Sequence, residues 1–80
     1  MAKNNIKVRA KVFGVQYKST SYYGNPSYWV TFETDNGVLT AYTATDAACG
    51  YGCRNYLGGS AEITYHRTRT GNYIIDYMAK

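Results

Sequence analysis

The chain has few of the residues on which disulfide scaffolds, metal centres and membrane spans depend. It contains two cysteines, Cys49 and Cys53, and one histidine, His66. Two cysteines are too few for a disulfide-rich secreted scaffold, and together with one histidine they do not complete a four-ligand zinc site. No uninterrupted apolar run approaches the roughly 20 residues of a membrane-spanning helix. The sequence therefore predicts no membrane segment, no bound metal and no cofactor.

The sequence also predicts neither a signal peptide nor an acidic surface. Charged residues interrupt residues 1–11, whereas a secretory signal needs an apolar core of about 7–15 residues, so the expected location is the cytoplasm. Five acidic residues stand against nine Lys and Arg, which gives a net charge of +4. This moderate excess suits a polyanionic partner, although many small domains are mildly basic without binding one.

Catalytic residue combinations are also sparse. A general base needs a nucleophile and an orienting group within hydrogen-bond reach, and nothing in the sequence places Cys49 or Cys53 beside His66. None of the five acidic residues forms an obvious pair for acid–base chemistry. The glycines of residues 50–59 fit neither the P-loop nor the dinucleotide pattern. We expect a protein that is not an enzyme.

Aromatic residues, by contrast, are abundant: ten Tyr, two Phe and one Trp among 80 residues. The stretch Tyr28–Thr43 (YWVTFETDNGVLTAYT) predicts a β-hairpin, because two runs of β-branched and aromatic residues flank Asn-Gly, the strongest short hairpin signal. With Asn36-Gly37 as the central residues of a type I′ turn, Asp35 faces Val38, and counting outward from this pair gives the rest of the register.

Side chains alternate along a strand, so this hairpin has two faces. One face is apolar enough to be a core and consists of Tyr28, Val30, Phe32, Leu39 and Ala41. The other face is polar but contains a Trp and a Tyr, and it consists of Trp29, Thr31, Glu33, Val38, Thr40 and Tyr42. We expect the second face to carry the function.

The N-terminal part of the chain predicts a long first strand over Ile6–Tyr17. Its apolar residues point inward, and Lys7, Arg9 and Lys11 point outward. Gly14 interrupts the alternation, which indicates a bulge or bend. A bent first strand can pair with two different neighbours, as a small closed barrel requires. Residues 18–27 (KSTSYYGNPS) predict a loop that exposes Tyr22 and Tyr23.

The C-terminal half predicts a short helix and two more strands. Thr45 or Asp46 can begin a helix of about three turns, which glycines at 58 and 59 end. Strands are expected at Ala61–Arg67 and Tyr73–Met78, and in the last one Asp76 favours burial of the set Tyr73, Ile75 and Tyr77. Three strands, a helix and two strands is the order of the oligonucleotide/oligosaccharide-binding (OB) barrel. We therefore predict a mainly β fold in which residues 1–80 form one domain, a five-stranded OB-like barrel with a short helix between strands 3 and 4.

Three pieces of the sequence carry a resemblance: GNPSYWVTFETDNG, TATDAACGYGCRNYLGG and RTGNYIIDY. They resemble a pattern in short bacteriophage-encoded OB-like proteins of unassigned function. In that pattern a GNPxY strand start precedes a glycine hairpin, a Thr/Asp-Ala helix start with an Asn-x-x-Gly end, and a final hairpin. The resemblance covers most of the chain after Tyr22. It implies an OB-like fold and a phage origin, and hence the cytoplasm of a host cell, but no particular activity.

The polar face of the hairpin suggests a function. If the first strand pairs with the second, its three outward cations lie beside Trp29, and cations with flat rings are what single-stranded nucleic-acid binding uses. We expect non-catalytic binding of single-stranded DNA or RNA by Lys7, Arg9, Lys11, Tyr22, Tyr23, Trp29, Thr31 and Tyr42. The alternative is a protein-interaction module, an inhibitor or assembly factor that contacts a host or phage protein, because Tyr, Trp and Arg also anchor protein interfaces.

Overall fold

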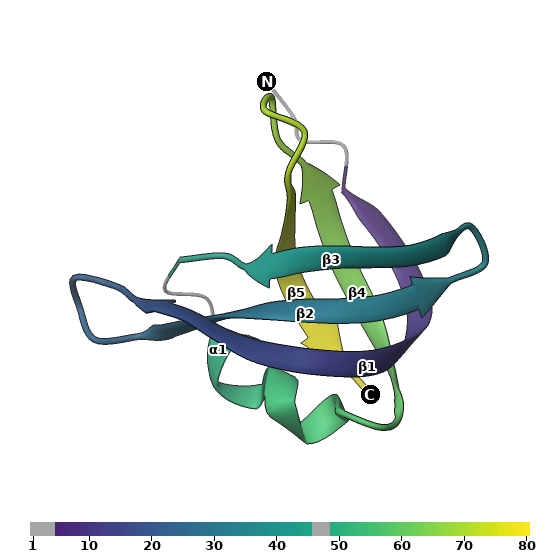
Figure 1. Cartoon of the computed structure of the whole chain (residues 1–80), viewed down its shortest axis with the longest axis horizontal. Coiled ribbons are helices and arrows are strands. Elements are labelled where there is room, and N and C mark those ends of the chain that lie inside the picture. Colours follow the sequence, from purple (N-terminus) through teal and green to yellow (C-terminus); the bar gives the residue numbers. More distant parts are fainter. Residues whose placement is uncertain (1–4, 46–48) are drawn as a thin grey trace.

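A computed structural model describes residues 5–45 and 49–80 of the chain. Five strands close into a barrel in the order β1-β2-β3-β5-β4, and a short helix lies between β3 and β4 (Figure 1). The strands are β1 (Ile6–Thr20), β2 (Pro26–Thr34), β3 (Gly37–Thr43), β4 (Ser60–Arg67) and β5 (Tyr73–Ala79). The predicted fold class, a mainly β, five-stranded OB-like barrel with a helix between strands 3 and 4, is confirmed.

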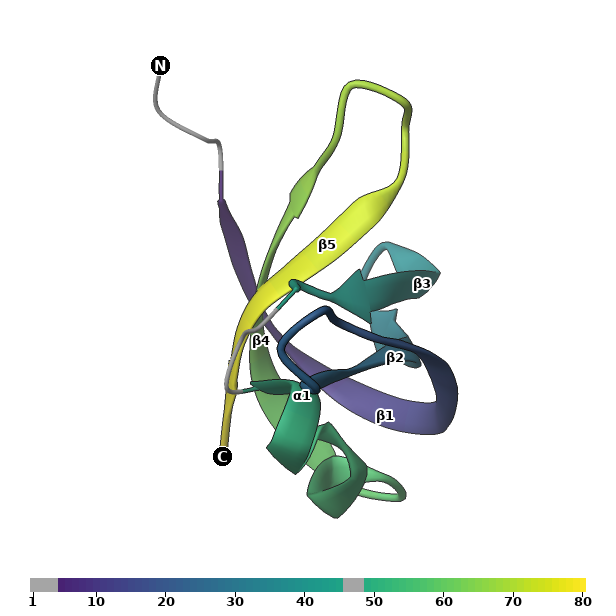
Figure 2. The same ribbon diagram turned by 90° about the vertical axis from the view of Figure 1, so that its left-hand side faces the viewer.

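The first strand is bent and serves two neighbours, as Gly14 predicts. Residues Ile6–Lys11 pair with β4, and residues Lys11–Thr20 pair with β2. The register slips between Val12 and Gly14, so the bend is a β-bulge at this place. Figure 2 shows β1 running along one side of the barrel and curving round to β2. The strand also continues to Thr20 instead of ending at Tyr17, so the loop before β2 is shorter than expected.

The core forms from alternate residues of the strands. Val30, Phe32 and Ala41 are fully buried, and Tyr28 and Leu39 pack against them, so the predicted inner face of the hairpin is confirmed. The Phe32 ring lies edge-on to Tyr65, with centroids 5.6 Å apart. The buried Thr43 hydroxyl accepts a hydrogen bond from the Tyr28 amide at 3.1 Å, which satisfies a polar group inside the barrel.

The predicted register of the β2–β3 hairpin is wrong by two residues. Thr34 pairs with Gly37, and Asp35-Asn36 form the turn in place of Asn36-Gly37. Gly37 has φ +119° and opens β3, so the glycine places its positive φ in the strand and not in the turn. A shift by an even number of residues leaves every side chain on its original face, which is why the two predicted faces survive the wrong register.

The predicted inner face of the last strand is only partly right. Ile75 is buried, but Tyr77 is 59% exposed and Met78 is buried instead. Thr64 pairs with Tyr77 while Tyr65 pairs with Ile75, so Asp76 is an extra residue in the ladder. This bulge reverses the facing of the later residues, and simple alternation therefore fails beyond Asp76.

The helical segment is short and tied to β1. It consists of α1 (Cys49–Gly52) and a 3-10 turn, η1 (Cys53–Tyr56). The predicted start at Asp46 lies outside the described residues, and Thr45 is a turn residue just before that gap. After η1, the Gly58 amide donates to Val12 O at 3.0 Å, and the Val12 amide donates to Gly59 O at 2.8 Å. In the described parts of the chain, no helix has the length and apolarity that crossing a membrane requires.

The helix can approach the start of β2 only because residue 50 lacks a side chain. A Cβ atom built on Gly50 would lie 2.3 Å from the backbone oxygen of Pro26, far inside van der Waals contact. The same construction at Gly52, two residues along, meets nothing within 4 Å. Gly50 therefore fixes how closely α1 docks on β2, and Gly52 does not.

Replacing Gly50 with alanine should lower the free energy of unfolding by about 1–3 kcal/mol, the usual cost of overpacking. The clash is with backbone, so neither partner can relieve it by a rotamer change. Urea denaturation followed by circular dichroism measures the loss. The matched control, Gly52→Ala, should be neutral or should gain up to about 1 kcal/mol from helix propensity. Equal losses in the two variants would contradict the close docking of α1 on β2.

Candidate nucleic-acid interface

One cation and two aromatic rings meet on the outer face of the barrel. Trp29 on β2 pairs with Tyr42 on β3, and their ring centroids lie 5.1 Å apart at an interplanar angle of 81°. The Lys18 ammonium nitrogen is 4.9 Å from the Tyr42 centroid and 5.8 Å from the Trp29 centroid. We call Lys18, Trp29 and Tyr42 the Trp29 cluster. Both rings are half-buried.

Lys18 was not among the residues expected at the site. It belongs to the extension of β1 beyond Tyr17, where the register with β2 slips between Tyr17 and Ser19. A bulge commonly re-aims a side chain, and here Lys18 is directed over the rings of the neighbouring strands. If the predicted strand had been continued past Tyr17, the alternation would have placed Lys18 on the same outer face as Gln16. Residues 18–27 were instead predicted to be a loop.

Lys7 and Arg9 do not lie beside Trp29, and that expectation is corrected. Their part of β1 pairs with β4, where Lys7 is opposite Thr64 and Arg9 is opposite Glu62. Lys7 approaches Glu62 at 3.8 Å, but the two side chains are 64% and 42% exposed, so the ion pair contributes little. The residue that pairs with Trp29 is Gln16. The bend precedes the part of β1 that faces the aromatic cluster.

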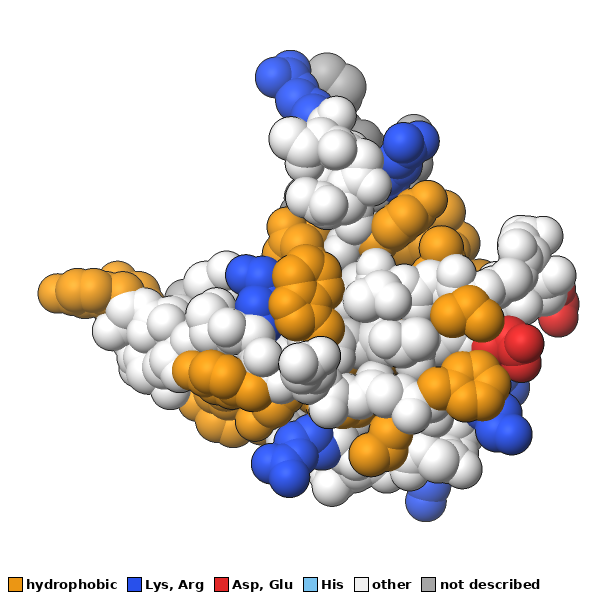
Figure 3. All heavy atoms as spheres, in the orientation of Figure 1, with side chains coloured by type: hydrophobic (Ala, Val, Ile, Leu, Met, Phe, Trp, Pro, Cys, Tyr) orange, Lys and Arg blue, Asp and Glu red, His pale blue; other side chains and the backbone are white. Residues whose placement is uncertain are grey.

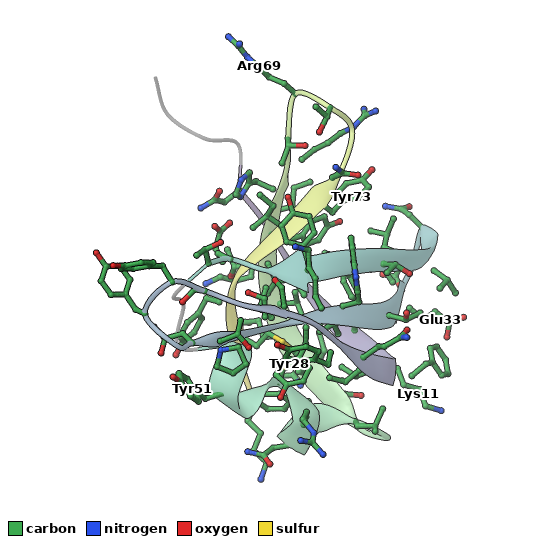
Figure 4. All side chains as sticks on the ribbon, turned by 60° about the vertical axis from the view of Figure 1, so that its left-hand side comes forward. Lys11, Tyr28, Glu33, Tyr51, Arg69 and Tyr73 are labelled. Carbon is green, nitrogen blue, oxygen red and sulfur yellow. The ribbon has the colours of Figure 1, made fainter. Side chains whose placement is uncertain are left out.

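Lys11 is also separated from the Trp29 cluster, at the other end of the sheet. It pairs with Glu33, and its ammonium lies 5.5 Å from the centroid of the Phe13 ring. Figure 4 places Lys11 and Glu33 together, away from the β1–β2 turn. A carboxylate beside this lysine lowers its value as a phosphate contact.

Small residues lie between these two ends of the face. Thr31 pairs with Gly14 on one side and Thr40 on the other, and the two threonine hydroxyls are 3.2 Å apart. A Cβ on Gly14 would meet Thr31 only at an ordinary 3.8 Å, so the glycine is not needed for packing. Because Gly14, Thr31 and Thr40 have small side chains, few atoms project from this part of the face. Thr31 thus lies two residues along β2 from Trp29, on the outer face of the sheet as predicted.

Tyr22 and Tyr23 form the tip of the β1–β2 turn and are the most exposed aromatic residues described, at 96% and 79%. Their rings meet edge to face with centroids 5.4 Å apart. The turn is held by the Ser21 amide donating to Asn25 O at 2.8 Å, and Tyr51 of α1 bonds to the Asn25 side chain. The predicted exposure of both tyrosines is confirmed, on a turn whose base is fixed.

Two further cations flank the face on the β4–β5 turn. Arg67 ends β4, and Arg69 lies at the tip of the turn, which rises away from the barrel in Figure 4. Both side chains are exposed. In OB barrels the β1–β2 and β4–β5 loops border the binding face, which is the signal that could have added these arginines to the expected set.

The acidic side chains on this face lie at one end. Figure 3 shows basic and hydrophobic side chains together near the centre of the face, and acidic side chains together with further basic ones at the end that carries the β2–β3 turn. Glu33 and Asp35 belong to that end. A polyanion would therefore be attracted more strongly to the half of the face between the β1–β2 and β4–β5 turns than to the half that carries Glu33 and Asp35.

Of the groups considered for catalysis and metal binding, His66 pairs with an acidic residue and Cys53 is buried. His66 Nδ1 lies 2.7 Å from an Asp76 carboxylate oxygen, and both side chains are largely buried. The Cys53 thiol is buried, and this burial raises its pKa, which keeps it in the unreactive protonated form. Among the described residues, no three His, Cys, Asp or Glu side chains cluster as metal ligands. The contact between His66 and Asp76 joins β4 to β5, so a role in holding these two strands together explains it.

A scan of protein-family models, a search of curated proteins and a search of solved structures each found no match to the chain. The resemblance to phage-encoded proteins thus stays a prediction, and the site must be interpreted from its own geometry.

Replacing Lys18 with methionine should lower the free energy of unfolding by about 0.5–1 kcal/mol, the usual strength of an exposed cation–π contact. The same change made in a Tyr42→Leu, Trp29→Leu background should cost close to nothing, because the ring faces are gone. Urea unfolding followed by far-ultraviolet circular dichroism supplies the four free energies of this cycle. Lys7→Met is the matched control, since the ion pair of Lys7 with Glu62 is exposed. A Lys18 effect that persists without the rings would show that the cation–π contact is not its source.

Proposed function

We propose that this protein binds single-stranded nucleic acid on the outer face of β2 and β3, between the β1–β2 and β4–β5 turns. The observation that carries the proposal is the Trp29 cluster, in which one ammonium group lies over two aromatic rings. A strand needs a cation for its phosphate and a flat ring for its base at neighbouring points, and this cluster offers both. Its place on the barrel supports the proposal, because OB barrels bind oligonucleotides on this face.

The surroundings of the cluster suggest how a strand would be held. Tyr22 and Tyr23 offer further rings at one border, and Arg67 and Arg69 offer guanidinium groups for phosphates at the other. The low surface around Thr31 leaves room for the backbone. Stacking accepts any base, because every base has a π-face, so we expect little sequence preference. The acidic residues near the β2–β3 turn limit the site to a few nucleotides.

The proposal changes the role expected of the first three cations. Lys7 and Arg9 lie over β4, and Lys11 is paired with Glu33, so none of them adjoins the aromatic cluster. They contribute to the net charge of +4 and hence to long-range attraction. Direct phosphate contacts are assigned instead to Lys18, Arg67 and Arg69.

Titration of a fluorescent oligothymidylate of about 8 nucleotides, within the usual site size of one OB barrel, tests the proposal. Trp29→Ala should weaken binding about 5- to 150-fold, corresponding to the loss of one stacked base. Replacing Lys18, Arg67 and Arg69 together with glutamine should reduce the slope of log affinity against log salt by about 2.

The matched control replaces Lys7, Arg9 and Lys11 with glutamine, which removes the same charge from the other part of β1. This control should retain most of the salt slope. Absence of binding by the unmodified protein at low salt would refute the proposal. Equal losses in the two triple variants would instead assign binding to net charge alone and remove the role of the face.

The protein-interaction alternative has one observation in its favour. Tyr22 and Tyr23 project from a turn, residues 21–25, that contains no charged side chain. Exposed tyrosines without cations are typical anchors of protein interfaces. Replacing both with serine should weaken oligonucleotide binding if they stack on bases. Unchanged oligonucleotide affinity in that double variant would assign the turn to a protein partner.

A further inference from the structure

The aromatic rings of the Trp29 cluster are partly covered by the cluster's own lysine. The Lys18 ammonium nitrogen lies 4.9 Å from the centroid of the Tyr42 ring and 5.8 Å from that of the Trp29 ring. The two rings also meet edge to face, and both side chains are half-buried. A base stacked on a ring would lie about 3.5–4 Å from it, the contact distance of carbon atoms. The ammonium therefore occupies space that a base stacked on the same side needs.

This lysine can leave the rings without any movement of its strand. The ladder between β1 and β2 includes Tyr17 and Ser19 and passes over Lys18 between them. The backbone of Lys18 is thus held on both sides, and rotation of the side chain is sufficient. Lys18 is exposed, and among the residues that the structure describes no carboxylate forms an ion pair with it. Exposed side chains change rotamer within picoseconds to nanoseconds.

We infer that Lys18 acts as a movable cover of the rings, which leaves them when a base stacks there and contacts an adjacent phosphate of the same strand instead. This inference rests on the function proposed above and states how its site selects a ligand. The strand supplies both parts of the exchange. A base takes the place of the ammonium over the rings, and a phosphate takes the place of the rings as the partner of the ammonium.

The cost of uncovering the rings is smaller than the gain from stacking. An exposed cation–π contact favours the covered state over the open one about 2- to 5-fold, so the rings are open in about a sixth to a third of the free molecules. One stacked base raises affinity by a factor of about 5 to 150. A ligand without charge gives Lys18 no new partner, and its affinity is lowered by the whole cost. The site therefore favours ligands that carry bases and phosphates together.

Nuclear magnetic resonance of the full chain shows where the lysine lies. Ring currents shift protons that lie over an aromatic face, so the terminal methylene protons of Lys18 should be shifted to lower frequency in the free protein. Replacing Trp29 and Tyr42 with leucine should abolish this shift. Saturation with an oligothymidylate of about 8 nucleotides should also abolish it, because the ammonium leaves the rings. A shift that is absent from the free protein, or that persists in the saturated complex, overturns the inference.

Affinity for an uncharged strand measures the cost of the cover. Methylphosphonate oligothymidylate keeps the bases but has no charge on its backbone. Lys18→Ala should bind this strand about 3- to 6-fold more tightly than the unmodified protein does, since its rings are always open. The same variant should bind the ordinary charged strand more weakly at low salt, because a phosphate contact is lost.

The matched control is Arg69→Ala, which removes a cation for which the described residues show no contact with a ring. This variant should bind the charged strand more weakly and the uncharged strand as the unmodified protein does. Circular dichroism verifies that both variants are folded. Should Lys18→Ala fail to fold, the resonance measurement on the unmodified protein decides.

The outcomes separate this inference from the proposed function. If Lys18→Ala binds the uncharged strand no more tightly than the unmodified protein, the cover is overturned, while binding of the charged strand leaves the proposed function intact. An uncharged strand that binds none of the proteins also overturns the cover, because stacking is then too weak to displace the lysine. Absence of binding of the charged strand by the unmodified protein refutes the proposed function, and the inference with it.

Discussion

The bend in β1 is the constraint on which the rest of the molecule depends. Five strands close only because one strand is the neighbour of both β4 and β2. The bulge near Gly14 is where the strand passes from one neighbour to the other. Of the cations that precede it, Lys7 and Arg9 lie beside β4 and Lys11 lies beside Glu33, whereas Lys18, beyond the bulge, lies over the rings of β2 and β3. The same bend that closes the barrel decides which charges share a surface with Trp29.

The sequence predicted the features that depend on alternation within one strand or one hairpin. The burial of Val30 and Phe32 and the outward position of Trp29 result from period-two alternation, whatever the partner residue is. This explains why a register wrong by two residues still sorted both faces correctly. The order of elements was equally visible, because glycine and polar clusters mark the connections and a glycine marks the bend.

The features that the sequence did not reveal depend on single extra residues or on closure of the barrel. A bulge at Asp76 reverses the facing of the later residues in β5, and no glycine marks it, so Tyr77 was predicted to be buried. Lys18 was missed because the polar and turn-forming residues 18–27 predicted a loop, whereas β1 continues to Thr20. Arg67 and Arg69 join the site only because closure brings the β4–β5 turn to the border of a face built by earlier strands. No local pattern can report such a contact, since it joins segments far apart in the chain.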